Sequence, residues 1–174
     1  MAIRNIITTE NPILRQKAKK VHRFDTSLQK LIDDMFETMH VAHGVGLAAP
    51  QIALSIRLFV AEYEEEDGTH HKVVIFNPEI VKAEGEELGT EGCLSIPGYI
   101  GENIRRAAKI LVKGQDVHGK LIRIPAQGWF ARILQHEIDH LDGILFLDRL
   151  DSPDDLREVR EEDLESGEEA AVLE

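Results

Sequence analysis

Hydrophobic residues recur at helical spacing near both ends of the chain. Between about Asp25 and His43 they fall at three- and four-residue steps, which predicts an amphipathic helix with one apolar face. Helical spacing returns from Gln127 to about Leu141. Gly44 and Gly143 follow these two segments, and each can adopt the left-handed conformation that commonly ends a helix. A third, short helix is predicted over residues 12–18 because a proline opens it.

The middle of the chain has a different pattern, rich in β-branched residues and interrupted by turn signals. Strands are predicted over residues 56–63, 72–77, 104–115 and 121–125, with hairpin turns at 65–68 and 116–119. Helices on both sides of a strand-rich middle predict an α+β fold with mainly antiparallel sheets. We expect these sheets to pack around the later helix, with the other helices on the N-terminal side.

Charge separates the chain into a nearly neutral body and an acidic tail. Residues 151–174 hold eleven acids and two bases, a balance of −9, whereas residues 1–150 have a balance of −3. We therefore predict a body over 1–150 and an acidic C-terminal tail over 151–174. Ser152, Pro153 and Asp154 favour a short solvated helix at the start of this tail.

Composition excludes several classes of protein. The net charge of −12 argues against direct nucleic-acid binding, which needs cations that replace phosphate counterions. No apolar run reaches the roughly 18 residues of a membrane span, and no targeting segment is evident. Cys93 is the only cysteine, so a reducing compartment is indicated. We expect a cytoplasmic protein.

The strongest chemical signal is the HExxH segment from His136 to His140. On a helix, residues four apart share a face, so the two imidazoles can bind one metal ion. Glu137, beside the first histidine, lies at the offset where a carboxylate can take a proton from water at the metal.

A catalytic metal of this kind needs a third protein ligand. The metzincin pattern would place a histidine where Phe146 stands, which excludes that family. A thermolysin-like downstream acid would fall in the charged tail. The remaining candidate is Cys93, because the flanking Gly92 and Pro97 indicate a shaped segment. A thiolate with two imidazoles favours Fe(II), Co(II), Ni(II) or Zn(II).

A third segment, Gly44-Val45-Gly46-Leu47-Ala48-Ala49-Pro50-Gln51, is made mostly of small residues. Such a run lets a substrate backbone approach closely, and Gln51 offers an amide donor. Taken alone, this segment is better explained as a small-residue loop with a surface glutamine.

Together the three segments, GVGLAAPQ, EGCLS and QHEIDH, resemble the signature motifs of the peptide deformylase family in the same order. The resemblance covers roughly residues 3–150 and includes the Asn11–Arg15 segment. It implies removal of the formyl group from the N-terminal formylmethionine of nascent polypeptides, with release of formate. It also implies Fe(II) as the metal in cells, with zinc, nickel or cobalt as substitutes.

The resemblance also implies residue roles. Cys93, His136 and His140 match the family's metal ligands, and Glu137 matches its acid/base. Gln51 and the backbone N–H of Leu94 match the donors that hold the formyl oxygen. Val45, Gly46 and Ile133 match substrate contacts. Arg105 falls at a familiar arginine after the cysteine motif. Ile100 stands where some members carry an arginine near the peptide, which leaves contacts beyond the first residue open.

Two other functions remain open at this point. A metallopeptidase shares HExxH but predicts cleavage of internal peptide bonds. A non-catalytic metal-binding relative would not need Glu137. Some relatives dock on the ribosome through a basic C-terminal segment, but the tail here is acidic. That mechanism therefore does not transfer, and transient ribosome association stays open.

Overall fold

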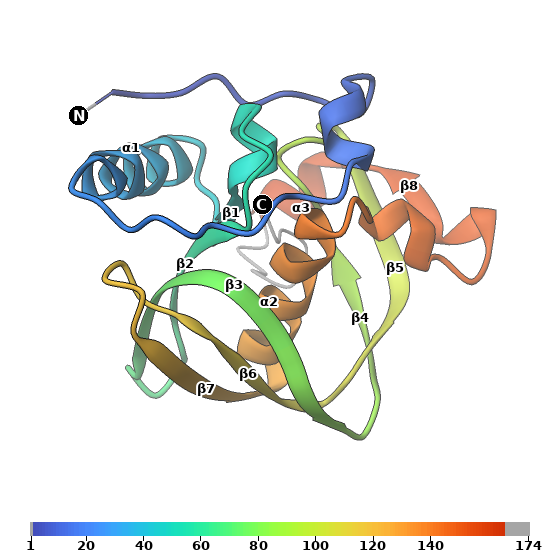
Figure 1. Cartoon of the computed structure of the whole chain (residues 1–174). Coiled ribbons are helices and arrows are strands. Elements are labelled where there is room, and N and C mark those ends of the chain that lie inside the picture. The colour runs from blue at the N-terminus through green and yellow to red at the C-terminus, as the bar shows by residue number, and fades with distance from the viewer. Residues whose placement is uncertain (1, 166–174) are drawn as a thin grey trace.

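A computed structural model describes residues 2–165 of the chain (Figure 1). Its helices are α1 (Ser27–Val41), α2 (Gly128–Leu141) and α3 (Glu161–Glu165), with 3₁₀ helices η1 (Pro12–Arg15), η2 (Ala49–Ile52), η3 (Phe146–Arg149) and η4 (Pro153–Asp155). Its strands are β1 (Gly46–Ala48), β2 (Leu58–Glu64), β3 (His70–Glu84), β4 (Glu87–Glu91), β5 (Tyr99–Arg106), β6 (Lys109–Gln115), β7 (Leu121–Gln127) and β8 (Leu156–Glu158).

The strands form two antiparallel sheets around α2. One sheet has the order β1-β2-β3-β6-β7 and the other the order β4-β5-β8. Helix α2 runs through the interior between them, whereas α1 covers β1 and β2 from outside (Figure 1). The expected α+β fold, with mainly antiparallel sheets around the HExxH helix, is confirmed.

Both long helices end in the hydrogen-bond pattern of a left-handed cap. After α2, Gly143 has φ 74°, and the Ile144 N–H donates to Asp139 at 2.9 Å, so the predicted end is confirmed. After α1 the left-handed residue is His43, with φ 61°, and Gly44 follows it. The prediction of a left-handed Gly44 was therefore wrong by one residue.

The predicted strand over 104–115 is two strands that belong to different sheets. β5 ends at Arg106 and β6 begins at Lys109. Between them, the side chain of Gln135 on α2 bonds both the N–H and the C=O of Ala107 at 2.9 Å. These two bonds replace the strand-to-strand hydrogen bonds that the Ala107 backbone would make within a sheet. The chain therefore passes from one sheet to the other without a conspicuous turn residue.

Other departures from the predicted elements are short. Asn11 caps the first helix by accepting from the Ile13 N–H at 3.1 Å, but that helix is a 3₁₀ turn ending at Arg15. Pattern analysis did not identify β1, β4 and β8, two of which have only three residues. The hairpin turns at 65–68 and 116–119 are confirmed, with positive φ at Gly68 and Gly119.

The start of the acidic tail packs against the body. Ser152 caps η4, as expected, but β8 follows and pairs with β5, with Leu156 opposite Gly101. Arg157 bonds Asp163 at 2.8 Å and also pairs with Glu102 of β5. Residues 166–174 of the predicted tail lie outside the described residues, and the boundary at residue 150 stays a prediction.

Two apolar clusters lie on the two faces of the larger sheet, and a third lies around the cysteine segment. Phe130, Ile133 and Leu134 of α2 pack on one face, and Met35 and Met39 of α1 pack near the other. In the third cluster, Cys93 packs with a group contributed by η1, β5 and the region of η3: Leu14, Ile104, Leu145 and Phe146. Among residues 2–165, no helix is long and apolar enough to cross a membrane.

Candidate metal centre and active site

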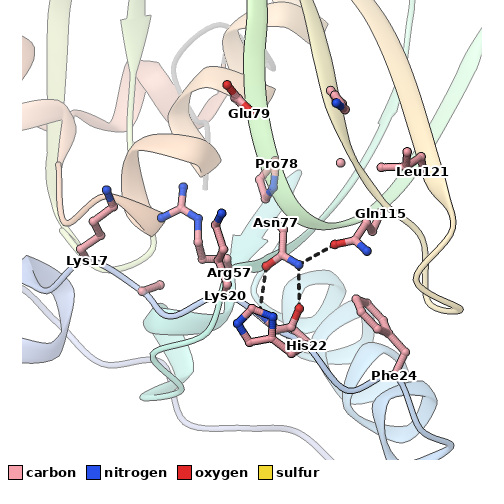
Figure 2. Close-up of a pocket in the computed structure, with 14 residues that line it drawn as sticks. Lys17, Lys20, His22, Phe24, Arg57, Asn77, Pro78, Glu79, Gln115 and Leu121 are labelled. Carbon is pink, nitrogen blue, oxygen red and sulfur yellow. Dashed lines mark hydrogen bonds between the residues drawn. The ribbon is translucent and has the colours of Figure 1, made fainter.

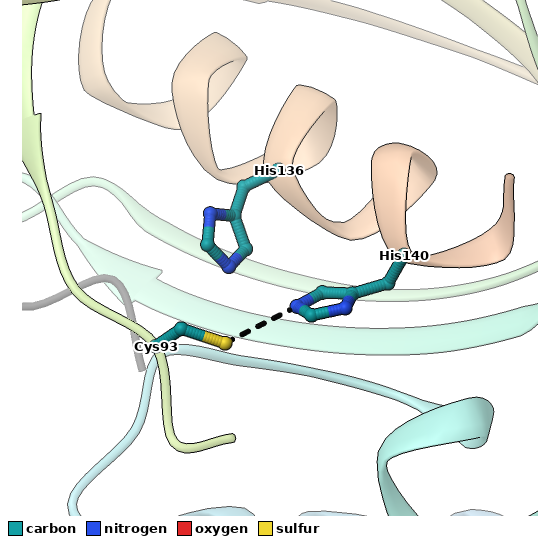
Figure 3. Close-up of side chains that lie close together, drawn as sticks. All are labelled: Cys93, His136 and His140. Atoms are coloured by element: carbon teal, nitrogen blue, oxygen red, sulfur yellow. Dashed lines mark hydrogen bonds between the residues drawn. The ribbon is translucent and has the colours of Figure 1, made fainter. Parts of the chain in front are cut away.

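Cys93, His136 and His140 converge on one buried point. Their ligand atoms all lie within 4.8 Å of one another, and Cys93 Sγ is 3.3 Å from His140 Nε2 (Figure 3). The histidines project from successive turns of α2, and Cys93 lies in the turn that follows β4. All three residues are at most 5% exposed. The predicted ligand set is therefore brought together by the fold.

The donor chemistry fits a divalent transition metal. Ligands about 2.0–2.3 Å from a tetrahedral ion lie roughly 3.3–3.8 Å from one another, a range that includes the Cys93–His140 distance of 3.3 Å. A thiolate and two imidazoles suit iron, cobalt, nickel or zinc. Three protein ligands leave the fourth position for water or substrate, as in catalytic sites.

Glu91 orients the first histidine, and sequence analysis assigned it no role. Its Oε1 lies 2.8 Å from His136 Nδ1, which directs His136 Nε2 toward the other ligands. Carboxylate–histidine pairs of this kind fix the tautomer and the ring orientation of a metal ligand. The available signal was position, because Glu91 lies two residues before Cys93 in the same motif.

Two arginines neutralise Glu91 in the interior. Arg106 bonds both carboxylate oxygens at 2.8 Å, and Arg132 bonds Oε2 at 2.7 Å. Burial opposes ionisation of Glu91, but the hydrogen bonds from Arg106 and His136 hold its pKa far below the usual range. Arg106 also pairs with Asp139 of the HExxH segment at 2.5 Å, so the network ties β4 and β5 to α2.

The arginine of this network is Arg106, one residue after the position that the family resemblance marked. Arg106 is 5% exposed, whereas Arg105 lies at the surface and pairs with Glu86 and Asp151. Neighbouring residues on a strand face opposite sides, so only one of them can reach the interior. Ile100 is 1% exposed within β5, which makes it a core residue.

Gln51 is held with its amide donor next to the cysteine. Its Oε1 accepts from the Ala48 N–H at 2.9 Å, which turns its Nε2 toward Ser95 Oγ at 3.2 Å and Cys93 Sγ at 3.7 Å. Gln51 is 1% exposed, so the alternative of a surface glutamine is wrong. Leu94 directly follows Cys93 and packs partly buried against the cluster that contains Ile52. The Gln51 amide and the Leu94 backbone therefore both lie beside the ligand set.

Glu137 is buried against the small-residue segment. A Cβ added at Gly46 would lie 2.4 Å from Glu137 Oε2, so only a glycine leaves room for this carboxylate. Burial, helped by the nearby carboxylates of Glu91 and Asp139, raises the pKa of Glu137 to about 7. Its Oε1 has no hydrogen-bond partner within residues 2–165. A carboxylate with this pKa can accept and return a proton near neutral pH.

The remaining predicted substrate residues, Val45 and Ile133, belong to the apolar cluster between α2 and the larger sheet. Ile133 is fully buried on α2, one turn before His136, and Val45 packs partly buried against the same cluster. Val45 is also fixed by its C=O, which accepts from the Glu62 N–H at 2.9 Å. The fold thus places apolar side chains beside the ligands and Glu137.

Comparisons with known proteins agree with this geometry. Residues 3–155 match the family model described as polypeptide deformylase. A peptide deformylase of Dehalococcoides mccartyi strain CBDB1 is 54% identical over 163 residues, covering 94% of this chain and 95% of that protein. One from Symbiobacterium thermophilum is 51% identical over 174 residues, covering 100% of this chain and 77% of that protein.

Solved structures give the same picture. The peptide deformylase of Thermus thermophilus superimposes with a TM-score of 0.81 at 48% identity, covering 87% of this chain and 88% of that one. The peptide deformylase of Thermotoga maritima gives a TM-score of 0.80 at 40% identity, covering 87% of this chain and 100% of that one.

Proposed function

The chain belongs to the polypeptide deformylase family, and from this membership we propose which of its residues perform the reaction. It is a metal-dependent hydrolase that removes the formyl group from N-terminal formylmethionine of new polypeptides. The observation that carries this assignment is the convergence of Cys93, His136 and His140 beside the buried Glu137.

Cys93, His136 and His140 would hold one divalent ion, with Fe(II) in the cell and zinc, nickel or cobalt as substitutes. The thiolate and imidazole donors support this set of metals. When bound, the ion supplies Lewis-acid chemistry, which makes water nucleophilic near neutral pH and stabilises developing negative charge. Glu91 keeps His136 in the orientation that binding requires.

Glu137 acts as the proton carrier. Its burial and its pKa of about 7 support this role, because a group titrating near the working pH can both accept and release a proton. It takes a proton from the attacking water and returns it to the departing amine. The products are formate and a free N-terminus.

Gln51 and Leu94 stabilise the oxygen of the formyl group as charge develops on it. The Gln51 amide is buried and tethered, so it would need little reorganisation during the reaction. Loss of one such donor typically costs about 10²–10³ in rate. Val45, Gly46 and Ile133 form the contacts to the methionine residue, which their position beside the ligands and Glu137 supports.

The substrates are formylated nascent polypeptides, so we place the enzyme in the cytoplasm. The net charge of −12 argues against direct nucleic-acid binding. The acidic tail does not resemble a basic docking segment, so we do not propose ribosome docking through the tail.

Glu137→Gln tests the assignment. In metal-loaded protein, wild type should release formate from formyl-Met-Ala and leave unformylated peptides intact. The variant should keep its metal and fold but lose about 10²–10⁴ in kcat, because an amide cannot carry the proton. Near-normal turnover in the metal-replete variant would refute the role of Glu137. Cleavage of internal peptide bonds by wild type would favour a metallopeptidase, and no hydrolysis of either substrate would favour a non-catalytic relative.

A further inference from the structure

A polar cavity of about 660 Å³ lies apart from the metal centre (Figure 2). It is bounded by the segment that precedes α1, the bend of β3 at Asn77, and strands β6 and β7. None of Cys93, His136 and His140 lines it. Its volume is within the roughly 300–1,000 Å³ of small-molecule sites.

The cavity collects cations in a strongly acidic protein. Its lining includes Lys17, Lys20, Arg57 and Lys113, with Glu79 as the only acid among the described residues that line it. The adjoining segment 15–23 holds five lysines and arginines and no acid, although the whole chain has a net charge of −12. Glu79 in the lining and Asp142, which pairs with Arg57, balance only part of the charge of these four cations, so the cavity keeps an excess of positive charge that favours an anion.

Three of these cations have no ionic partner among the residues that the structure describes. Lys17, Lys20 and Lys113 form no ion pair within residues 2–165, although Glu79 stands opposite Lys113 in the β3–β6 register. Arg57 is held in place by Leu141 O at 2.9 Å and Asp142 Oδ1 at 3.0 Å, through Nη1 alone. Figure 2 shows Lys17, Lys20 and Arg57 gathered on one side of the cavity.

Hydrogen bonds fix the segment that carries these cations and join it to Asn77. Asn77 Oδ1 accepts from the Val21 N–H at 2.9 Å, and its Nδ2 donates to Val21 O at 2.8 Å and Gln115 Oε1 at 2.7 Å. The backbone of Lys19 is bonded to Ser55 and Arg57. The cavity is therefore preformed, which lowers the entropic cost of binding.

The remaining wall is apolar. Phe24 and Leu121 line the side away from Lys17 and Lys20 (Figure 2). Phe24 packs edge-on against Phe76, with ring centroids 5.3 Å apart. A ligand that fills the cavity thus meets cations at one end and apolar carbon at the other.

We propose that this cavity binds a small phosphorylated organic molecule, with its phosphate among Lys17, Lys20 and Arg57 and its organic part against Phe24. Lysine and arginine are the usual partners of phosphate groups. The volume and the preformed walls of the cavity favour a ligand of nucleotide size over an extended polyanion. This binding site goes beyond deformylation and involves none of its residues.

Inorganic phosphate and adenosine monophosphate are suitable probes, titrated into zinc-loaded full-length protein and followed by backbone amide NMR. We expect saturable shifts at Val21, Asn77 and Gly114, weakened by added salt, with adenosine monophosphate binding more tightly than phosphate. The double variant Lys17→Gln with Lys20→Gln should weaken binding about tenfold or more.

A matched control is Lys82→Gln with Lys109→Gln, which removes the same charge from β3 and β6 at positions that do not line the cavity. It should bind as wild type does, and both double variants should keep the deformylation rate, which confirms their fold. The proposal is overturned if neither probe saturates, or if both double variants weaken binding equally. Binding of a single-stranded RNA oligonucleotide without binding of either small probe would likewise overturn it.

Discussion

Replacing Glu91 with glutamine tests how far a buried ion network controls the metal centre. Glu91 is fully buried, and each of its oxygens accepts two hydrogen bonds. Oε1 accepts from Arg106 and His136 at 2.8 Å, and Oε2 accepts from Arg106 at 2.8 Å and Arg132 at 2.7 Å. A glutamine amide nitrogen on either side would point its hydrogens at two donors. Arg132 would lose the counter-charge of Glu91, and Arg106 would keep only its pair with Asp139.

The magnitude follows from these contacts. Removing one partner from a buried ion pair costs about 3–5 kcal/mol in free energy of unfolding. For a chain of this size that corresponds to a fall in Tm of roughly 6–20 °C. Loss of the carboxylate behind a histidine ligand typically weakens metal binding about 10–100-fold. The metal-loaded protein should therefore lose a further ~1.4–2.7 kcal/mol.

The assay is unfolding of the metal-free and metal-loaded forms of wild type and Glu91→Gln, with metal affinity measured by competition against a chromophoric chelator. Glu86→Gln is the matched control, because Glu86 is exposed and pairs with the exposed Arg105. That control should change stability by about 1 kcal/mol or less. Wild-type metal affinity in Glu91→Gln would refute the proposed orientation of His136 by Glu91.

Three further changes have defined outcomes. Gly46→Ala should keep metal content but lower kcat, because the new methyl group would lie 2.4 Å from Glu137 Oε2 and displace it; unchanged kinetics would contradict this packing. Asp34→Asn should destabilise the protein at neutral pH. Asp34 accepts from the Ala2 N–H and pairs with Arg4, which lowers its pKa to about 2. The Asp34 carboxylate therefore stabilises the folded protein above its unfolded pKa of about 3.9, and this stabilisation is lost as pH falls through about 2. The denaturation curves of wild type and Asp34→Asn should therefore converge in strong acid and diverge above about pH 4. Truncation after residue 150 should lower Tm because it removes β8 and the packing of Leu156 against the cluster of Cys93; a Tm equal to that of the full chain would show that this strand contributes no stability.

The buried network also fixes the position of the HExxH helix relative to the sheets. Asp139, between the two histidines, pairs with Arg106 at 2.5 Å and with Arg149 at 2.7 Å. Gln135, just before His136, bonds the backbone between β5 and β6. The helix is therefore anchored to both sheets by the residues that flank its ligands, and a displacement of either sheet would move the ligands.

Local sequence determined the parts of this protein that depend on local spacing. The four-residue step placed His136 and His140 on one face of a helix, apolar periodicity located α1 and α2, and Gly143 marked the end of α2. Cys93 was the third ligand candidate that remained once downstream ligands were excluded, and the motif resemblance pointed to the same residue; its role as a ligand stays a prediction. The predictions of the two helices and of the end of α2 held because helix geometry and capping act over a few residues.

Tertiary structure alone decided which charged groups are buried and which strands pair. The chain has 32 acids, and its hydrophobic and polar pattern does not separate Glu91, which is fully buried, from the exposed acids; only its position beside Cys93 sets it apart. Arg106 and Arg132 reach Glu91 from 15 and 41 residues away. The run 104–115 reads as one strand because its β-type pattern continues through the point where α2 redirects the chain. Partners distant in sequence leave no periodic signal, since their energy arises only when the fold removes them from water.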